Sequence, residues 1–219
     1  MDRNVPDGEL LGLIRGRRSV RHFDNSPVKH QAIIRILEAG RLAPSGSNRQ
    51  PWRYIVVEDP ALKQAIRTEC ERIEARFHQR APAELASWMN AHGITAQKPF
   101  LEEAPYLIVA YYRRREPYAV PSIWVSIAFM LLQVEQEGLG TLTYTPVGAR
   151  LNTLLCVPAS FQLTAILPIG VPADYRHQDR LALSEIANAN RFGEPFDEGG
   201  GPDGISSVER AEQTQCPQN

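Results

Sequence analysis

The sequence has few cysteines, few lysines and no long apolar run. Only three of its 219 residues are cysteine (Cys70, Cys156 and Cys216), and they are widely separated. This number and spacing argue against a disulfide scaffold or a zinc site, and they are typical of a reducing compartment. The N-terminus lacks the apolar core of a signal peptide, and the longest apolar stretch, residues 123–132, is too short to span a membrane. We therefore expect a soluble, cytoplasmic protein with no membrane contact.

Charge is nearly balanced, which limits the class of partner. The chain has 24 Lys and Arg against 25 Asp and Glu, for a formal net charge of -1. A nucleic-acid-binding protein that works through whole-surface charge is not expected with this balance. His22, His92 and His177 have no carboxylates at the spacing of metal ligands, so we assign no metal.

Hydrophobic periodicity predicts one folded domain, residues 5–196, followed by a disordered polar tail, residues 197–219. Helices are expected over residues 8–15 (with Asp7 as N-cap), 30–42, 60–80, 123–137, 149–156 and 182–188, and strands over 53–57, 106–112, 141–145 and 163–170. Residues 81–99 show no regular pattern, and the helix at 123–137 is apolar on nearly all faces. That helix is expected to lie in the core or in a dimer interface.

A basic loop follows the first predicted helix. Arg15, Arg17, Arg18 and Arg21 lie within seven residues, with Ser19 among them. Guanidinium groups bind phosphate oxygens in a bidentate way, and a hydroxyl adds another donor. The loop is therefore either a small-anion site or a solvated basic turn.

Two further segments are candidates for ligand binding. The loop APSGSNRQPW at residues 43–52 combines small residues, which let a flat ligand approach the backbone, with the donors Asn48, Arg49 and Gln50. It is otherwise an ordinary Pro/Gly connection. The run TLTYTP at residues 141–146 places alternate threonines on one face of a strand, where they bind polar ligand edges or simply reflect high β-propensity.

Together these segments resemble the nitroreductase superfamily of FMN-dependent flavoproteins. The resemblance is carried by RRSVRHF from Arg17, APSGSNRQPWRYIVV from Ala43, SIWVSIAFMLLQVEQEGLGT from Ser122 and LPIGVP from Leu167. It implies an α+β fold in which a mixed, mainly antiparallel sheet is flanked by helices. It also implies an intertwined homodimer with two FMN sites in the subunit interface and a C-terminal segment that wraps the partner.

The resemblance also implies the cofactor residues. Arg17, Arg18 and Ser19 match the phosphate-binding loop, and Arg21 matches a cation near N1 and O2 of the flavin, where reduction leaves negative charge. The other positions implied to bind FMN are Pro44, Ser45 and Gly46, partly from the other subunit, Thr143, Tyr144 and Thr145 near N5, and Arg180 at the phosphate. Thr145 and Arg21 are the implied catalytic residues.

Within the superfamily, the sequence is most similar to the iodotyrosine deiodinase branch, in which a lid supplies Glu, Tyr and Lys to clamp a halotyrosine zwitterion. Lys98 aligns with that lysine and Glu74 corresponds to the glutamate, although both also suit a solvated surface. At the tyrosine position the sequence has His78 or Phe77, depending on a one-residue gap. Gly46 completes the expected substrate contacts. Trp88 is either a lid over an aromatic substrate or a surface residue, and Trp124 belongs to the core or an interface.

These features support several hypotheses. The first is an FMN enzyme that uses NADH or NADPH to reduce electron-poor aromatics, such as nitroaromatics and quinones, by ping-pong hydride transfer through flavin N5. The second is reductive dehalogenation of a halophenol or halotyrosine. The third is a protein that binds or consumes its own flavin, and a fourth is a scaffold without flavin.

Overall fold

The computed structural model describes residues 9–146, 150–174 and 179–196. The chain divides into two units, Met1–His177 and Gln178–Asn219, and each is described by itself. The predicted N-cap Asp7, the start of the predicted domain at residues 5–8 and the predicted tail at residues 197–219 lie outside the described residues.

Unit 1 is built on a three-stranded antiparallel sheet with the order β2-β3-β4. The strands are β2 (Trp52–Val57), β3 (Tyr106–Arg113) and β4 (Phe161–Ile169). The register places Ile108 of β3 between Val56 of β2 and Leu167 of β4. A second, two-stranded antiparallel sheet pairs β1 (Phe23–Asp24) with β5 (Val171–Pro172).

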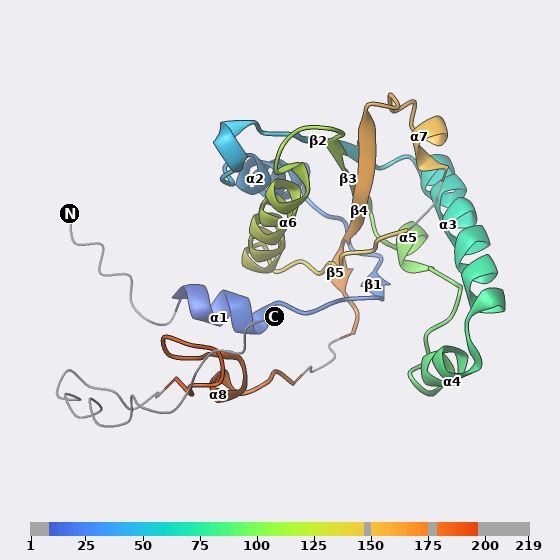
Figure 1. The fold of residues 1–219 in the computed structure, drawn as a ribbon. Coiled ribbons are helices and arrows are strands. Elements are labelled where there is room, and N and C mark those ends of the chain that lie inside the picture. The colour runs from blue at the N-terminus through green and yellow to red at the C-terminus, as the bar shows by residue number, and fades with distance from the viewer. Residues whose placement is uncertain (1–8, 147–149, 175–178, 197–219) are drawn as a thin grey trace, which may run out of the picture. The chain divides into compact units, whose positions relative to one another are not determined.

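Helices cover both faces of the three-stranded sheet. The helices of unit 1 are α1 (Glu9–Gly16), α2 (His30–Arg41), α3 (Pro60–Arg80), α4 (Ala83–Ala91), α5 (Phe100–Glu103), α6 (Ala119–Gln136) and α7 (Leu151–Leu154), with a 3-10 turn η1 (Gly46–Asn48). Figure 1 shows α2 and α6 on one side of the sheet and α3 and α5 on the other. The expected α+β class, with an antiparallel sheet flanked by helices, is confirmed.

The central strand β3 explains this layering. Successive side chains of a strand point to opposite faces, and here both sets are apolar and buried. Leu107 and Val109 belong to the core cluster that includes Ile66 of α3, whereas Ile108 and Ala110 belong to the cluster that includes residues of α2 and α6. A strand that is buried on both faces requires a helical layer on each side.

The buried lysine Lys63 joins α3 to α5. Its Nζ donates to the carbonyl oxygens of Ala104 at 2.7 Å and Glu102 at 3.3 Å, at the end of α5. Unpaired carbonyls at a helix C-terminus favour a cation. Burial lowers the pKa of this lysine, so the contact fixes α5 against α3 through hydrogen bonds to the backbone.

The predicted strand at residues 141–145 is wrong as a continuous strand. Thr141 forms an isolated parallel bridge with Ser19, and Tyr144 forms an isolated antiparallel bridge with Ile166. Gly140 also forms an isolated antiparallel bridge with Gly170, so the segment lies along β4 and its C-terminal end through single bridges at residues 140 and 144, and no continuous ladder forms. The threonines consequently do not share one environment: Thr141 is buried, Thr143 is half-buried and Thr145 is exposed.

Among the differences from the predicted helices are α4, which was not predicted, and the start of α6; α7 is also shorter than the helix predicted at residues 149–156. Residues 81–99, predicted to be irregular, contain α4, which begins after Pro82 and ends before Gly93 with its φ of 63°. Proline before a helix and glycine after it are typical boundaries. α6 begins at Ala119 rather than Ile123, because Pro121 lies in its first turn, where a missing N–H costs no helical hydrogen bond.

The apolar helix α6 has one buried face and one exposed face. Ile123, Ile127 and Met130 are fully buried, whereas Trp124 and Phe129 are about two-fifths exposed, at 39% and 41%. By length and composition α6 could cross a membrane, a test that the core helix of a soluble protein also passes. Its buried face packs against the sheet, and the apolar side chains of its other face stay partly exposed among the described residues.

Unit 2 contains α8 (Leu183–Ile186) within the helix predicted at residues 182–188. The carboxylate of Glu185 accepts a hydrogen bond from the backbone N–H of Ala182 at 2.7 Å and so stabilises the helix start. An isolated bridge joins Asn188 to Pro195. The side chains of Ile186 and Phe192 are strongly exposed.

Truncation on the α2/α6 face of β3 is expected to destabilise the protein strongly. Ile108→Ala should lower the free energy of unfolding by about 2–5 kcal/mol, because it leaves a cavity between the sheet and two helices. The matched control Ile34→Ala, which changes a half-exposed residue of α2, should cost about 0.5 kcal/mol or less. Urea unfolding at one protein concentration measures both, and equal losses would contradict the layered core.

Candidate functional site

The basic loop of residues 17–21 is fixed by backbone contacts. The N–H of Arg17 donates to Leu13 O at 3.0 Å and ends α1, and the N–H of Val20 donates to Thr141 O at 3.0 Å. The Asp174 carboxylate accepts hydrogen bonds from the backbone N–H groups of Arg21 and His22 at 3.3 and 3.4 Å. The structure thus brings the basic loop beside the start of the TLTYTP segment, two of the three segments singled out in the sequence.

The predicted phosphate residues differ in exposure. Arg17, Arg18 and Ser19 are half-buried, and Arg21 is exposed. The Arg18 guanidinium donates to the carbonyl oxygens of Arg15 and Arg17, so it also stabilises the C-terminus of α1. The Arg21 guanidinium makes a long contact of 3.5 Å with Ser19 O. Several donors are therefore concentrated on one short loop.

The Pro44–Gly46 segment is attached to a different part of unit 1, the start of α6. The N–H of Gly46 donates to the Ser122 hydroxyl at 3.1 Å, and the Ser45 hydroxyl accepts from the N–H of Gln50 at 3.0 Å. A Cβ at Gly46 would lie 2.6 Å from Cβ of Tyr118, so only glycine allows this approach. Ser47 and Asn48 adopt left-handed φ values of 49° and 52°, which keeps the loop tight.

Three side chains that the sequence assigned to a lid meet Tyr144, which it assigned to the flavin, and we call the four the Glu74 cluster: Glu74, His78, Lys98 and Tyr144. The Tyr144 hydroxyl donates to Glu74 Oε1 at 2.9 Å. Lys98 Nζ lies 3.4 Å and His78 Nε2 lies 3.9 Å from Glu74 Oε2. Only 21% of the Glu74 side chain and 11% of the Lys98 side chain are exposed. Neither residue is a solvated surface charge.

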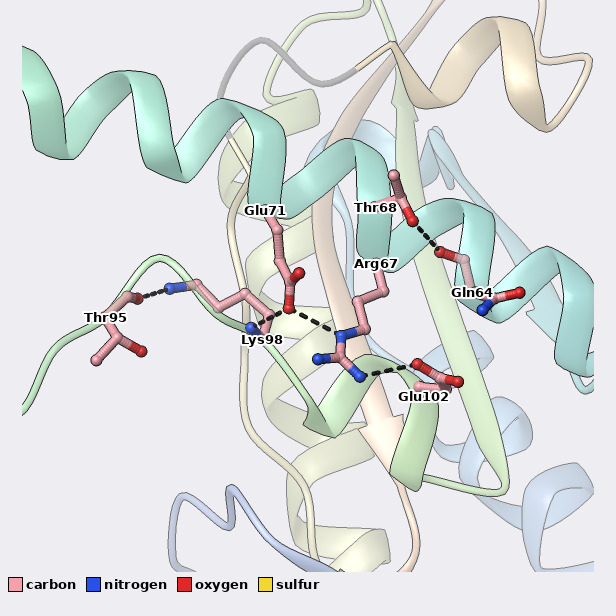
Figure 2. A network of polar contacts seen from close by, with 7 residues as sticks. All are labelled: Gln64, Arg67, Thr68, Glu71, Thr95, Lys98 and Glu102. Atoms are coloured by element: carbon pink, nitrogen blue, oxygen red, sulfur yellow. Dashed lines mark hydrogen bonds and ion pairs between the residues drawn. The ribbon is translucent and has the colours of Figure 1, made fainter.

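Lys98 is held in the Glu74 cluster by a second carboxylate (Figure 2). Its backbone N–H donates to Glu71 Oε1 at 2.7 Å, and its Nζ donates to Thr95 O at 2.5 Å. Glu71 also accepts from Arg67 Nε at 2.8 Å, and Arg67 Nη1 contacts Glu102 Oε2 at 2.8 Å. The loop before α5 is therefore tied to α3 by charged hydrogen bonds.

His78 and Phe77, the two candidates for the tyrosine position of the predicted lid, have different surroundings. His78 faces Glu74, one turn away on α3, whereas Phe77 is half-exposed and touches the His78 ring edge-on at 6.1 Å between centroids. Trp88 of α4 is exposed and stacks on His92 at 4.4 Å. Within the described residues, no three His, Cys, Asp or Glu side chains gather in a way that could hold a metal.

Tyr144 and its neighbour Thr145 point to different surroundings. Tyr144, predicted near the flavin, is 8% exposed, and its ring meets Phe100 edge-on at 5.6 Å. Burial, together with Cys70 and Glu74, raises the pKa of Tyr144. Thr145 is exposed. The contact between Tyr144 and Glu74 joins residues 70 positions apart, and no local sequence signal indicates it.

Arg180 belongs to unit 2, and the other predicted site residues belong to unit 1. It is exposed, and its Nη1 donates to Asp179 O at 3.1 Å. Because each unit is described by itself, its place at the phosphate stays a prediction.

Comparison with known proteins assigns the family. The model of the nitroreductase family matches residues 14–171. The chain belongs to the nitroreductase family. Its curated relatives include an iodotyrosine deiodinase from Thermotoga neapolitana, 39% identical over 166 residues, which cover 75% of this chain and 89% of the relative. Another, from Haliscomenobacter hydrossis, is 34% identical and covers 78% of this chain and 85% of the relative.

Solved structures of nitroreductase-family proteins agree with the fold. An iodotyrosine deiodinase bound to FMN and 3-iodo-L-tyrosine is 36% identical, with a TM-score of 0.74 over 80% of this chain and 97% of that one. A nitroreductase with bound FMN from Bacteroides fragilis is 22% identical, with a TM-score of 0.67 over 83% and 99%. At this low identity, the likeness to the Bacteroides fragilis nitroreductase supports the fold alone.

The buried Tyr144 phenol should make stability fall at alkaline pH. Since its pKa is raised in the folded state, its contribution is complete below the ordinary tyrosine value of about 10 and is lost as pH rises above it. Tyr144→Phe should therefore reduce the loss of unfolding free energy between about pH 10 and 11 by roughly 1 kcal/mol. Urea unfolding at each pH measures this slope, and the control Tyr118→Phe, at an exposed tyrosine, should retain the wild-type slope.

Proposed function

We propose that this protein is an FMN-dependent reductive dehalogenase of halogenated phenols that carry an acidic head group. The observation that carries this proposal is the half-buried Glu74 cluster, whose lysine and carboxylate suit a charged ligand rather than a plain hydrophobic aromatic. The sequence identity of 39% and 34% to two iodotyrosine deiodinases supports the proposal. So does the likeness to a deiodinase bound to FMN and 3-iodo-L-tyrosine.

The residues of the basic loop fit an FMN phosphate. Arg17, Arg18 and Ser19 offer guanidinium and hydroxyl donors on one half-buried turn, as a dianionic group requires. Gly46 lets its backbone pack directly against Tyr118 at the start of α6, because a Cβ there would clash. Pro44, Ser45 and Thr143 complete the proposed flavin contacts, with Arg180 at the phosphate.

When bound, FMN supplies the electron pair that, with one proton, replaces the halogen of an aryl halide by hydrogen and releases halide. The exposed guanidinium of Arg21 stabilises the negative charge that reduction leaves on the cofactor. The Thr145 hydroxyl is exposed and able to hold or give a proton there. Lys98 and its neighbours orient the substrate and exclude water from its head group.

A second candidate function is NAD(P)H-dependent reduction of nitroaromatics and quinones. The observation that favours it is the absence of a tyrosine at the lid position where the deiodinase branch carries one, which here is His78 or Phe77; His78 faces Glu74. Such acceptors need no charged head group. NAD(P)H as reductant, a single domain over residues 5–196 and a cytoplasmic location remain predictions under either function.

We also infer that the protein works as a homodimer. The Pro44–Gly46 segment is hydrogen-bonded to α6, whereas the basic loop is hydrogen-bonded to the Thr141 segment. The residues implied to bind FMN therefore come from two separate parts of one chain. α6 exposes Trp124, Val125 and Phe129, and α1 exposes Leu10 and Ile14. Apolar residues gathered on a helix in this way indicate a protein interface.

Removal of Arg17 should weaken FMN binding. Arg17→Ala removes charge-assisted hydrogen bonds worth about 1.5–3 kcal/mol, so the dissociation constant for FMN should rise by roughly 10- to 100-fold. Flavin fluorescence titration measures it. Arg41→Ala, which breaks a surface pair with Glu38, is the matched control, and full flavin content in Arg17→Ala would contradict the phosphate assignment.

A charge on the exposed face of α6 should separate the subunits. Phe129→Glu should yield a monomer in size-exclusion chromatography and should lose FMN at the same time, because an unpaired carboxylate is costly in an apolar interface. Gln64→Glu places the same charge on the exposed surface of α3 and should remain dimeric and yellow. A Phe129→Glu monomer that keeps its flavin would place the whole site in one subunit.

The two candidate functions separate in one anaerobic screen. The FMN-loaded protein is given a reductant and then 3-iodo-L-tyrosine, other iodophenols, a nitroaromatic or a quinone, and iodide release and acceptor reduction are measured. The proposal predicts iodide release, with Lys98→Ala raising KM for acidic substrates about tenfold or more at full FMN content. The control Lys29→Ala changes an exposed lysine. Reduction of nitroaromatics without iodide release supports the second function, and flavin loss without turnover supports a flavin-consuming protein.

A further inference from the structure

We propose that an arginine patch at one end of the three-stranded sheet docks an acidic electron-carrier protein that reduces the bound FMN. The patch consists of Arg53 in β2, Arg113 at the end of β3, and Arg114 and Arg115, which follow it, and all four are exposed. This inference rests on the proposed function, because it names the source of the electrons that the reaction consumes. Direct reduction by NAD(P)H is the alternative source.

The register of the sheet brings the four arginines together. Arg113 lies opposite Phe161, the first residue of β4. Cζ of Arg53 and Cζ of Arg113 lie 5.9 and 5.4 Å from the centroid of the Phe161 ring. The backbone N–H of Arg114 donates to Ser160 O at 2.8 Å, just before the same strand. One aromatic ring therefore holds two guanidinium groups in fixed positions, with the other two arginines beside them.

The arginine patch lacks counter-charges of its own. Among the described residues, none of its four guanidinium groups forms an ion pair with a carboxylate; Glu116, the next carboxylate along the chain, lies 3.9 Å from Arg49 instead. By contrast, Arg35, Arg67 and Arg72 contact carboxylates at 2.5 to 2.8 Å. Like charges gathered on one surface repel one another and attract an anionic partner. The missing counter-charges are therefore expected on that partner.

The arginine patch adjoins both segments that are proposed to contact the flavin ring. The backbone N–H of Arg113 donates at 2.8 Å to the carbonyl oxygen of Pro51, which belongs to the same loop as the Pro44–Gly46 segment. A cavity of about 570 Å³ is lined by Arg114 and by Pro146, the residue that follows Thr145. Under the proposed function, a protein bound to the patch would lie beside the flavin site, as electron transfer requires.

An acidic protein fits the arginine patch better than other polyanions do. The formal net charge of the chain is -1, so charge outside the patch gives no general attraction for nucleic acid. A contact of the patch with the same patch of a second copy would oppose like charges. Complexes between electron-transfer proteins are typically small and bury less than about 1,200 Å². Complementary charge gives such complexes their fast association, so a compact patch of one sign is sufficient.

The electron balance of the proposed reaction is satisfied by a one-electron carrier. Two reduced carrier proteins are each oxidised by one electron, and these two electrons, with two protons from the solvent, reduce the bound FMN. Replacement of the halogen by hydrogen then consumes the electron pair and one proton. The second proton returns to the solvent with the halide.

Binding of a carrier protein without turnover tests the docking surface. The FMN-loaded protein is titrated in a calorimeter with an oxidised acidic ferredoxin of the plant type and with an acidic flavodoxin. We expect Kd to rise at least tenfold between about 50 and about 300 mM NaCl, because salt screens exposed charges. The double variant Arg114→Glu, Arg115→Glu should raise Kd at least tenfold at the lower salt concentration.

The matched control is Arg76→Glu, Arg80→Glu, which makes the same change of charge at exposed positions of α3. It should change Kd less than threefold. In anaerobic stopped-flow absorbance, the reduced carrier should bleach the bound FMN at least tenfold more slowly in the patch variant than in the wild type. Dithionite, which needs no docking surface, should reduce the FMN of both at the same rate.

Several outcomes would overturn the inference. These are binding of neither carrier, a Kd that salt or the patch variant leaves unchanged, and a patch variant that becomes monomeric in size-exclusion chromatography, which would place the patch in the subunit interface. Binding of a DNA duplex or of anionic lipid vesicles in place of both carriers also overturns it. If the double variant does not fold, Arg115→Glu alone decides.

The same material separates this inference from the proposed function. A protein that takes up no FMN overturns both. A protein that is reduced by the carrier but releases no iodide from any iodophenol overturns only the proposed dehalogenation. A protein that releases iodide with dithionite but binds no carrier overturns only the docking surface.

Discussion

Burial of β3 on both faces is the constraint on which the rest of unit 1 depends. Its alternate side chains enter two separate cores, one shared with α2 and α6 and the other with α3 and α5. A single slip in register would exchange these sets, and the small Ala110 would then face the layer that accommodates Tyr111. The sheet therefore fixes which helix carries which part of the site: α6 holds the Pro44–Gly46 loop, and α3 holds Glu74.

The segment that follows α6 links the helical layers on the two faces of the sheet to the residues of the candidate site. It touches the basic loop at Thr141, the edge strand β4 at Tyr144 and α3 through the Tyr144 hydroxyl. Two consecutive residues consequently have different tasks: Tyr144 is buried against Glu74, and Thr145 is exposed beside it. Tyr144, which contacts Glu74, is therefore covalently next to Thr145, the residue proposed to hold or give a proton at the flavin.

Local signals in the sequence predict much of the fold. The bounds of α3 follow from its N-cap Asp59, whose Oδ1 accepts from the N–H of Leu62 at 2.6 Å, and from Pro60 in the first turn. The strand predicted at residues 141–145 was wrong as a continuous strand, because β-propensity does not determine whether a continuous ladder of backbone hydrogen bonds forms. Glu74, His78 and Lys98 could be proposed from a family pattern, but their meeting with Tyr144 could not, since it depends on tertiary packing between segments far apart in the chain.

The charge balance of the whole chain hides strong local differences, and these decide its chemistry. Of the three lysines, Lys63 and Lys98 are buried and only Lys29 is exposed. Lys63 is satisfied by backbone carbonyls and so has a structural task. Lys98 is paired with the Glu74 carboxylate at 3.4 Å and donates to Thr95 O, and burying a charge is unfavourable unless it is paired in this way. Under the proposed function, an anionic head group of the ligand completes the coordination of the Lys98 ammonium.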